Sequence, residues 1–357
     1  MKQTMKLLAL LSFLLLAVKA GAQTIAFWNV ENYFEDKPHF RDKTRGIAKV
    51  VLALADSLGK PPSIVGLCEV ENEECMKALV RTPALRKYGY RYVHYDSPDH
   101  RGIDCALLWR SAGGICPGLG RLRASRAVPI RDTSGFVLPT RAILVVEFDS
   151  LSVVVCHLPS KRGGSPEASR RRLLALRTLA TVCDSLASSD SGGFYPQKLA
   201  ETSIFPQSGE KMGVNLAKTG QNDSPGGKMG VNPAKATVFG PIGGKLGPKP
   251  AVHRPIVVVG DFNDTRTALS DSIMHHLREL PADGGTIKFQ GVWEQIDRAF
   301  VSPGLDATLT VACLPFLTEA DKKHGGVKPR RTFIGPRYNA GLSDHLPIIV
   351  SFNLIYL

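Results

Sequence analysis

The sequence has few cysteines and lacks several motifs that mark common enzyme classes. Seven cysteines among 357 residues do not make a disulfide scaffold in a chain of this length, and no group of His and Cys has the spacing of a structural zinc site. The chain has no G-x-S-x-G segment, which argues against a serine hydrolase. It also has no P-loop, which argues against an NTP-dependent motor or a kinase.

A long apolar run occurs only near the start of the sequence. The run Leu7–Val18 follows Lys2 and Lys6 and precedes an Ala-Gly-Ala triplet at 20–22, an arrangement typical of a secretory signal peptide. The run is too short to span a bilayer comfortably, and no later segment is a better candidate. We therefore expect residues 1–22 to be a signal peptide. The protein would be exported to the periplasm or the extracellular space, as a monomer without stable membrane insertion.

The chain is strongly basic. Its 45 Lys and Arg residues against 32 Asp and Glu give a formal net charge of +13 at pH 7. A positively charged exported protein attracts polyanions such as nucleic acid or acidic lipid surfaces. A solvated surface without a partner is the alternative, and charge alone does not decide between the two.

Hydrophobic periodicity predicts eight strands and three helices. The strands are expected near residues 24–30, 63–69, 104–109, 142–149, 152–157, 256–260, 295–301 and 347–353, and the helices near 43–58, 71–81 and 167–187. Strands that alternate loosely with helices indicate an α/β or α+β fold. Three cysteines lie inside strand-like runs as small buried hydrophobes, and pairing among the other four, Cys75, Cys116, Cys183 and Cys313, is left open.

The segment from about 188 to 252 differs from the rest of the chain. It is rich in Gly, Pro, Ser and Lys, and the unit KMGVNLAK at 211–218 returns as KMGVNPAK at 228–235. Such a composition buries too little apolar surface to offset chain entropy. We expect a disordered insertion that interrupts one domain spanning 23–357.

Polar side chains follow or interrupt six of the apolar runs. They are Asn29, Glu69, His157, the pair Asp261 and Asn263, Asp297, and the pair Asp344 and His345. Each has an ordinary explanation: a turn, a helix start or a satisfied core histidine. Asp297 is harder to explain in this way, because a buried carboxylate needs a partner. Six such positions together indicate a site at one end of the strands.

The types of donor atom at these positions indicate phosphate-ester hydrolysis. Carboxylate and amide oxygens suit Mg²⁺ or Mn²⁺ rather than zinc. Two histidines, one of them oriented by an aspartate, supply proton transfer and positive charge. Hydrolysis of a phosphate ester needs a metal ion, a base that activates water and donors for the transition state.

The order of these motifs, N, E, H, GD-x-N, ID and SDH, resembles the endonuclease/exonuclease/phosphatase superfamily, which includes deoxyribonuclease I, apurinic endonucleases and sphingomyelinases. The motifs run from Ile25 to Phe352. The resemblance implies a deoxyribonuclease I-like α/β fold: a four-layer sandwich of two mixed β-sheets flanked by helices, with the site at one end of the sheets.

The resemblance also implies a metal site and a catalytic group. Glu69 would be the principal ligand of Mg²⁺, with Asn29 and Asp344 near the same metal, and Mn²⁺ or Ca²⁺ would be alternative ions. Asp261 would activate or orient water, and Asn263 would bind the phosphate or position that aspartate.

Three further residues complete the implied catalytic group. His345 would contact the scissile phosphate, and Asp297 would hold its imidazole. His157 would stabilise developing charge or protonate the leaving group. Arg101 and Asp104 lie where the family often has a polar residue that assists the phosphate. Lys161, Arg162 and Arg170 either bind a flanking phosphate or belong to a solvated loop.

The sequence thus predicts an exported metal-dependent phosphoesterase, with a nuclease acting on DNA or RNA as the first hypothesis. A phosphatase or phospholipase of the inositol phosphate or sphingomyelin type is the alternative. A non-catalytic binding module on the same fold fits less well, because a binder does not need Asp297 behind His345. The sequence leaves open the exact substrate, endo or exo action and the number of metals.

Overall fold

The computed structural model describes residues 23–160, 166–188, 254–265 and 273–354. The predicted signal peptide and nearly all of the predicted insertion lie outside these residues, as do Lys161 and Arg162. The described residues belong to one compact unit, built from chain on both sides of the segment 191–252. Among them, no helix has the length and apolar character needed to cross a membrane.

Two sheets form the centre of this unit. The first has six strands in the order β14 (Ala307–Val311), β19 (Ile348–Phe352), β1 (Gln23–Tyr33), β2 (Ile64–Val70), β4 (Asp104–Arg110) and β3 (Tyr90–His94). The second has seven strands in the order β10 (Arg278–Glu279), β13 (Asp297–Val301), β9 (Ile256–Asp261), β8 (Ser152–His157), β7 (Ile143–Phe148), β6 (Gly120–Val128) and β5 (Ile115–Cys116). Both sheets are mixed, because β1 pairs with β2 and β8 pairs with β9 in parallel, while the other described pairs are antiparallel.

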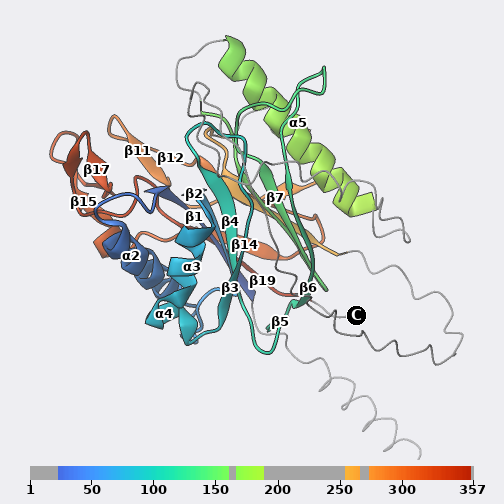
Figure 1. The fold of residues 1–357 in the computed structure, drawn as a ribbon, viewed down its shortest axis with the longest axis horizontal. Helices are drawn as coiled ribbons and strands as arrows, with labels where there is room; N and C mark the ends of the chain where they lie inside the picture. The colour runs from blue at the N-terminus through green and yellow to red at the C-terminus, as the bar shows by residue number, and fades with distance from the viewer. Residues whose placement is uncertain (1–22, 161–165, 189–253, 266–272, 355–357) are drawn as a thin grey trace, which may run out of the picture. The chain divides into compact units, whose positions relative to one another are not determined.

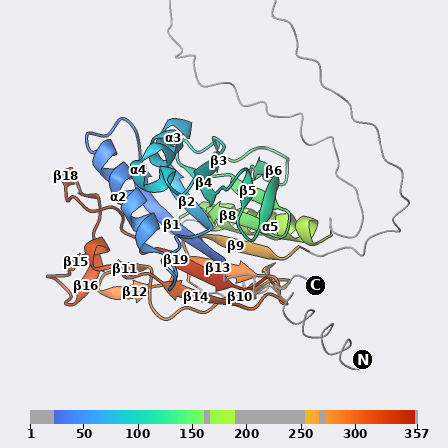
Figure 2. The same ribbon diagram turned by 90° about the horizontal axis from the view of Figure 1, so that it is seen from below.

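Helices cover the outer face of each sheet (Figure 1). The first sheet carries α2 (Phe40–Ala53), α3 (Glu73–Arg81) and α4 (Pro83–Arg86), and the second carries α5 (Pro166–Ser188). Three small strand pairs lie together beside the first sheet (Figure 2). They are β11 (Ile287–Phe289) with β12 (Val292–Glu294), β15 (Thr318–Ala320) with β16 (Val327–Pro329), and β17 (Phe333–Ile334) with β18 (Arg337–Tyr338). A 3₁₀ turn, Pro315–Leu317, precedes β15.

Three apolar clusters hold the four layers together. The largest joins the facing sides of the two sheets, through residues such as Phe27 of β1 and Val155 of β8. A second packs α2, α3 and α4 on the first sheet, and a third packs α5 on the second. The predicted four-layer α/β sandwich is therefore confirmed.

Most predicted strands and helices lie close to the observed ones, but the helix predicted at 43–58 is α2, which begins at Phe40 and already ends at Ala53. β8 has the predicted bounds, and α5 extends the predicted helix by one residue at each end. All seven cysteines are free thiols, and only Cys313 is exposed. The four cysteines whose pairing the sequence left open are therefore not joined in this structure.

The alternation of the strands brings polar residues to one edge of the layer between the sheets. In β9, Val257 and Val259 face the first sheet, and Asp261 continues the same row. In β1, Ile25, Phe27 and Asn29 likewise lie on one face of the strand. Because alternate residues of a strand share a face, the apolar rows of the core end in polar side chains at this edge.

Candidate functional site

Three strands of the second sheet place three predicted site residues side by side. In the strand register, His157 of β8 is opposite Asp261 of β9, which is opposite Asp297 of β13. Directly opposed residues on neighbouring strands point to the same face. Nε2 of His157 lies 3.5 Å from Oδ2 of Asp261. All three side chains are buried.

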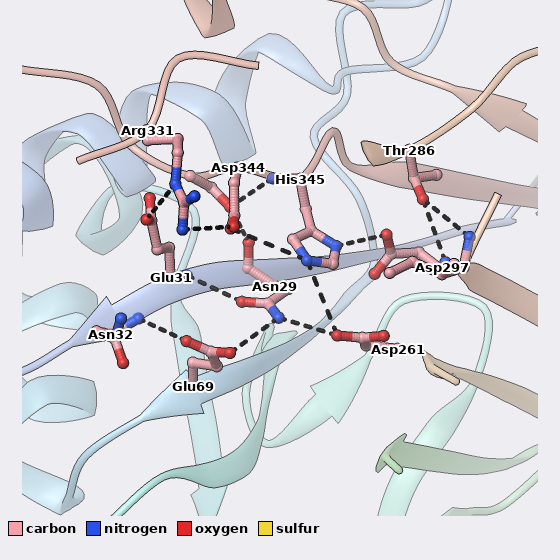
Figure 3. A network of polar contacts seen from close by, with 12 residues as sticks. Asn29, Glu31, Asn32, Glu69, Asp261, Thr286, Asp297, Arg331, Asp344 and His345 are labelled. Atoms are coloured by element: carbon pink, nitrogen blue, oxygen red, sulfur yellow. Dashed lines mark hydrogen bonds and ion pairs between the residues drawn. The ribbon is translucent and has the colours of Figure 1, made fainter. Parts of the chain in front are cut away.

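The first sheet contributes Asn29 and Glu69 to the same place (Figure 3). The Asn29 amide donates to Oδ2 of Asp261 at 3.1 Å and to Oε1 of Glu69 at 3.3 Å. The other oxygen of Glu69 accepts from the backbone N–H of Asn32 at 3.0 Å. Asn29 therefore links the two sheets here as a hydrogen-bond donor, and its role as a metal ligand stays a prediction.

His345 is fixed at four points. Its Nδ1 lies 2.7 Å from Oδ2 of Asp297, its N–H donates to Ser343 Oγ, and its carbonyl accepts from the indole of Trp28. It also forms an isolated bridge with Ile287 of β11. The Asp297 backbone is itself held, because its N–H donates to Thr286 Oγ1. These contacts leave Nε2 of His345 directed toward the site, 3.9 Å from Asp261.

Burial and the charges of neighbouring side chains determine the protonation states of His345, Asp261 and His157. Burial favours a neutral His345, but the negative charges of Asp297, Asp261 and Asp344 outweigh it and raise the pKa of His345 well above its ordinary value. Burial, assisted by the charge of Asp297, raises the pKa of Asp261 to about 7. Burial also lowers the pKa of His157 well below its ordinary value, helped by Arg141 and Arg101. The site thus combines one charged imidazole with one neutral imidazole.

Asn263 supports Asp261 rather than facing it with its side chain. Its backbone N–H donates to Oδ1 of Asp261 at 2.8 Å, while its amide donates to the carbonyl of Leu158. Four non-glycine residues with positive φ occur at this edge: Glu31, Asn32, Glu69 and Asn263. Such backbone costs free energy and gathers at functional sites, where the surrounding structure enforces it.

A model of the endonuclease/exonuclease/phosphatase family matches residues 36–193, and the site motifs lie within and beyond that range. The match identifies residues 36–193 as part of an endonuclease/exonuclease/phosphatase domain. A comparison with curated protein sequences found no match.

Solved structures of this superfamily share the fold. An endonuclease/exonuclease/phosphatase family protein from Bacteroides thetaiotaomicron has 14% identity and a TM-score of 0.53, over 94% of this chain and 98% of that one. Truncated TDP2 from Caenorhabditis elegans has 13% identity and a TM-score of 0.52, over 94% and 99%. A mannosyl-6-phosphatase from Bacteroides thetaiotaomicron has 13% identity and a TM-score of 0.50, over 92% and 99%. At these identities the likeness concerns the fold alone.

The matched family is described by nucleases and phosphatases, which hydrolyse phosphate esters, and the match supports this coarse activity for the chain. The sequence predicts a divalent metal ion as the cofactor. The site fits such an ion on two grounds. Its donors are carboxylate and amide oxygens, which hard cations prefer. Asp261, Asp297 and His345 also offer ligand atoms that lie within 4.8 Å of one another. Asp297 already pairs with His345, and the roles of Glu69 and Asp344 as metal ligands stay predictions.

The structure adds Glu31, Lys43 and Arg331, which the sequence did not single out. Arg331 pairs with Oε1 of Glu31 at 3.1 Å and with Oδ2 of Asp344 at 3.0 Å. Burial and the charge of Asp344 raise the pKa of Glu31, and burial lowers the pKa of Lys43 to about 8. The one available signal was spacing, since Glu31 follows Asn29 by two residues in an apolar strand.

Asp104 has a structural role beside the site. Its carboxylate lies 3.1 Å from Nε2 of His94 and accepts from both the N–H and the hydroxyl of Ser97. The two oxygens of Asp104 therefore bind β3 and the segment that connects β3 to β4. Arg101 lies near Asp99, 3.8 Å from its carboxylate, and lines a neighbouring cavity.

Replacing Asp261 by Asn should stabilise the metal-free protein more at pH 8 than at pH 4.5. The carboxyl has a pKa of about 7 when folded, against an ordinary value of 3.8. Between these values the folded state holds a proton that the unfolded state has lost, so wild-type stability falls as pH rises from about 4 to about 7. Asn has no such proton. Thermal unfolding in EDTA should show a melting-temperature gain that grows over this window and then levels off.

The exposed residue Asp306 provides the matched control for this experiment. Asp306→Asn should not show a gain that grows over the same window. A gain for Asp261→Asn that stayed constant from pH 4.5 to pH 8 would show that burial does not raise the pKa of Asp261.

Proposed function

We propose that this protein is an exported metal-dependent phosphodiesterase that acts on DNA or RNA. One observation carries the chemistry: a buried carboxylate, Asp261, lies between a positively charged His345 and a neutral His157. A carboxylate with a pKa near neutrality suits a group that takes a proton from water. The imidazolium of His345 suits a group that contacts the anionic phosphate.

Because His157 is neutral, one of the two roles that the sequence suggested for it fits better than the other. An imidazole whose pKa is depressed holds its single proton firmly and donates a hydrogen bond from one ring nitrogen. Its Nδ1 has no hydrogen-bond partner among the described residues. Of the two roles that the sequence suggested, stabilisation of developing charge therefore fits His157 better than donation of a proton to the leaving group.

Asp297 would act through His345. The 2.7 Å contact to Nδ1 fixes the ring and favours its charged form, as expected of a carboxylate that orients an imidazole. Glu69 and Asp344, with Asn29 beside them, would hold Mg²⁺, and Mn²⁺ or Ca²⁺ would be alternative ions. A bound divalent cation would neutralise part of the phosphate charge.

A cavity beside the site supports a substrate that extends beyond one phosphate. It has a volume of about 380 Å³ and is lined in part by Arg101, Arg141 and Arg171. Arg141 donates to the carbonyl of Leu158, which also accepts from Asn263, so the cavity adjoins the catalytic edge. Arginines next to a phosphate site suit the flanking phosphates of a polynucleotide, and the formal charge of +13 favours the same partner.

A phosphatase that acts on a small sugar phosphate is the second candidate. The same cavity contains the carboxylates of Asp99 and Glu167, and a mixture of acidic and basic groups suits sugar hydroxyls. A mannosyl-6-phosphatase also shares the fold. Export rests on residues 1–22 alone and is part of the proposal.

Metal removal is the first test. EDTA should abolish hydrolysis of bis(p-nitrophenyl) phosphate, and Mg²⁺ or Mn²⁺ should restore it, because the proposed ligands are oxygens. Glu69→Gln should raise the metal concentration needed for half-maximal rate. Glu74→Gln, on the exposed face of α3, should leave that concentration unchanged. Full activity in EDTA would contradict the proposal.

The second test separates a polynucleotide from a small substrate. Arg171→Gln should raise the KM for a single-stranded oligonucleotide by roughly 3- to 10-fold at low salt, the scale of one hydrogen bond of ordinary strength, and by less at high salt. Hydrolysis of bis(p-nitrophenyl) phosphate should not change, because this substrate has no flanking phosphate. Arg177→Gln, on the same helix but away from this cavity, is the control.

Oligonucleotide turnover that is unaffected by Arg171→Gln would argue against phosphate binding in the cavity. A preference for sugar monophosphates over every oligonucleotide would favour the second candidate.

A further inference from the structure

Arg331 joins two carboxylates that come from distant parts of the sequence. Its Nε donates to Glu31, near the end of β1, and a terminal nitrogen forms an ion pair with Asp344, just before β19 (Figure 3). The two distances are 3.1 and 3.0 Å. A guanidinium presents several donors in a fixed plane, so it can hold two carboxylates in a defined relation.

Glu31 is the fixed end of this bridge. Its Oε1 accepts from Arg331, and its Oε2 accepts from the backbone N–H of Thr332 at 2.8 Å. The amine of Lys43 donates to the Glu31 carbonyl and to the Thr332 hydroxyl, so both residues are tied to α2 as well. Glu31 is 6% exposed. Because both of its oxygens already accept hydrogen bonds from the protein, Glu31 is an anchor.

Asp344 is the carboxylate that Arg331 orients. Its Oδ2 is held by Arg331, and its Oδ1 lies 3.9 Å from Nε2 of His345. Arg331 thus leaves one oxygen of Asp344 directed toward the catalytic edge. The guanidinium itself lies on the outer side of the carboxylates, since the Arg331 side chain is 46% exposed while that of Glu31 is 8% exposed.

We propose that Arg331 is a positioning residue that fixes the Asp344 carboxylate for binding of the divalent cation, with Glu31 as its anchor. The inference rests on the proposed function, because it takes Asp344 to be a metal ligand. Without the guanidinium, Asp344 loses its fixed orientation and Glu31 becomes a buried carboxylate whose Oε1 has lost its donor. The site must then order Asp344 when the cation binds, and affinity falls.

The opposite arrangement makes a different prediction. If Arg331 occupied the place of the cation, it would have to leave when the metal binds, and its removal would tighten metal binding. The sign of the change in metal affinity therefore separates a positioning residue from a competing cation.

Calorimetric titration of the metal-free protein with Mn²⁺ tests the proposal without measuring turnover. Arg331→Gln should raise the Mn²⁺ dissociation constant by about 10-fold or more, the usual effect of removing a group that orients a metal ligand. Arg331→Lys keeps the charge but not the planar fork, so it should restore only part of the affinity. Arg337→Gln, in the neighbouring β18, should bind Mn²⁺ like the wild type.

Glu31→Gln and the double variant Glu31→Gln/Arg331→Gln test whether the two residues act as a unit. The double variant should bind Mn²⁺ no more weakly than Arg331→Gln alone, because residues in one network are not additive. Asp344→Asn should weaken binding at least as much as Arg331→Gln. Thermal unfolding of each variant in EDTA, with a single cooperative transition, shows that the protein remains folded.

Three results would overturn the inference. An unchanged or lower dissociation constant in Arg331→Gln would exclude a positioning role, while leaving the proposed function intact if the wild type binds Mn²⁺. Wild-type affinity in Asp344→Asn would show that the oriented carboxylate is not a ligand. A wild-type protein that binds no Mn²⁺ at millimolar concentration would refute the proposed metal dependence together with the inference.

Discussion

The ion pair between Asp297 and His345 is the contact on which the site depends. Asp297 begins β13 in the second sheet, and His345 precedes β19 in the first, so their 2.7 Å contact joins the two sheets at the edge where the chemistry would occur. Neither group is stable alone in this place: a buried carboxylate needs a cation, and a buried imidazolium needs an anion. The two charges thus stabilise each other. Asp261 lies beside them, and burial together with the charge of Asp297 raises its pKa to about 7, although the charge of His345 opposes the shift.

The sequence predicted the part of the site that strand periodicity controls. Rows such as Val257, Val259 and Asp261 alternate in register with a buried face, so the polar residue at the end of each row had to reach the edge of the core. The same argument applies to His157 at the end of β8. The motif order then indicated the superfamily, and with it the sandwich.

What the sequence could not predict depends on long-range contacts between irregular segments. Arg331 reaches Glu31 across 300 residues, through a loop with no hydrophobic period from which to infer its position. Asp104 was grouped with a phosphate-assisting region, yet its partner is His94, a pairing set by the β3–β4 register. No residue of the strand β6 is fully buried, so its sequence has no apolar run of the kind from which the other strands were predicted. In each case tertiary packing, rather than local pattern, decides the contact.

A double-variant cycle on turnover tests the central claim, that Asp297 acts through His345 at the phosphate. The rate constant kcat/KM for bis(p-nitrophenyl) phosphate would be measured with Mg²⁺ for the wild type, Asp297→Asn, His345→Gln and the combined variant. We predict that each single change lowers kcat/KM by about 10²-fold or more, and that the combined variant is no slower than His345→Gln alone. A wild-type rate in Asp297→Asn, or two losses that multiply in the combined variant, would contradict the account.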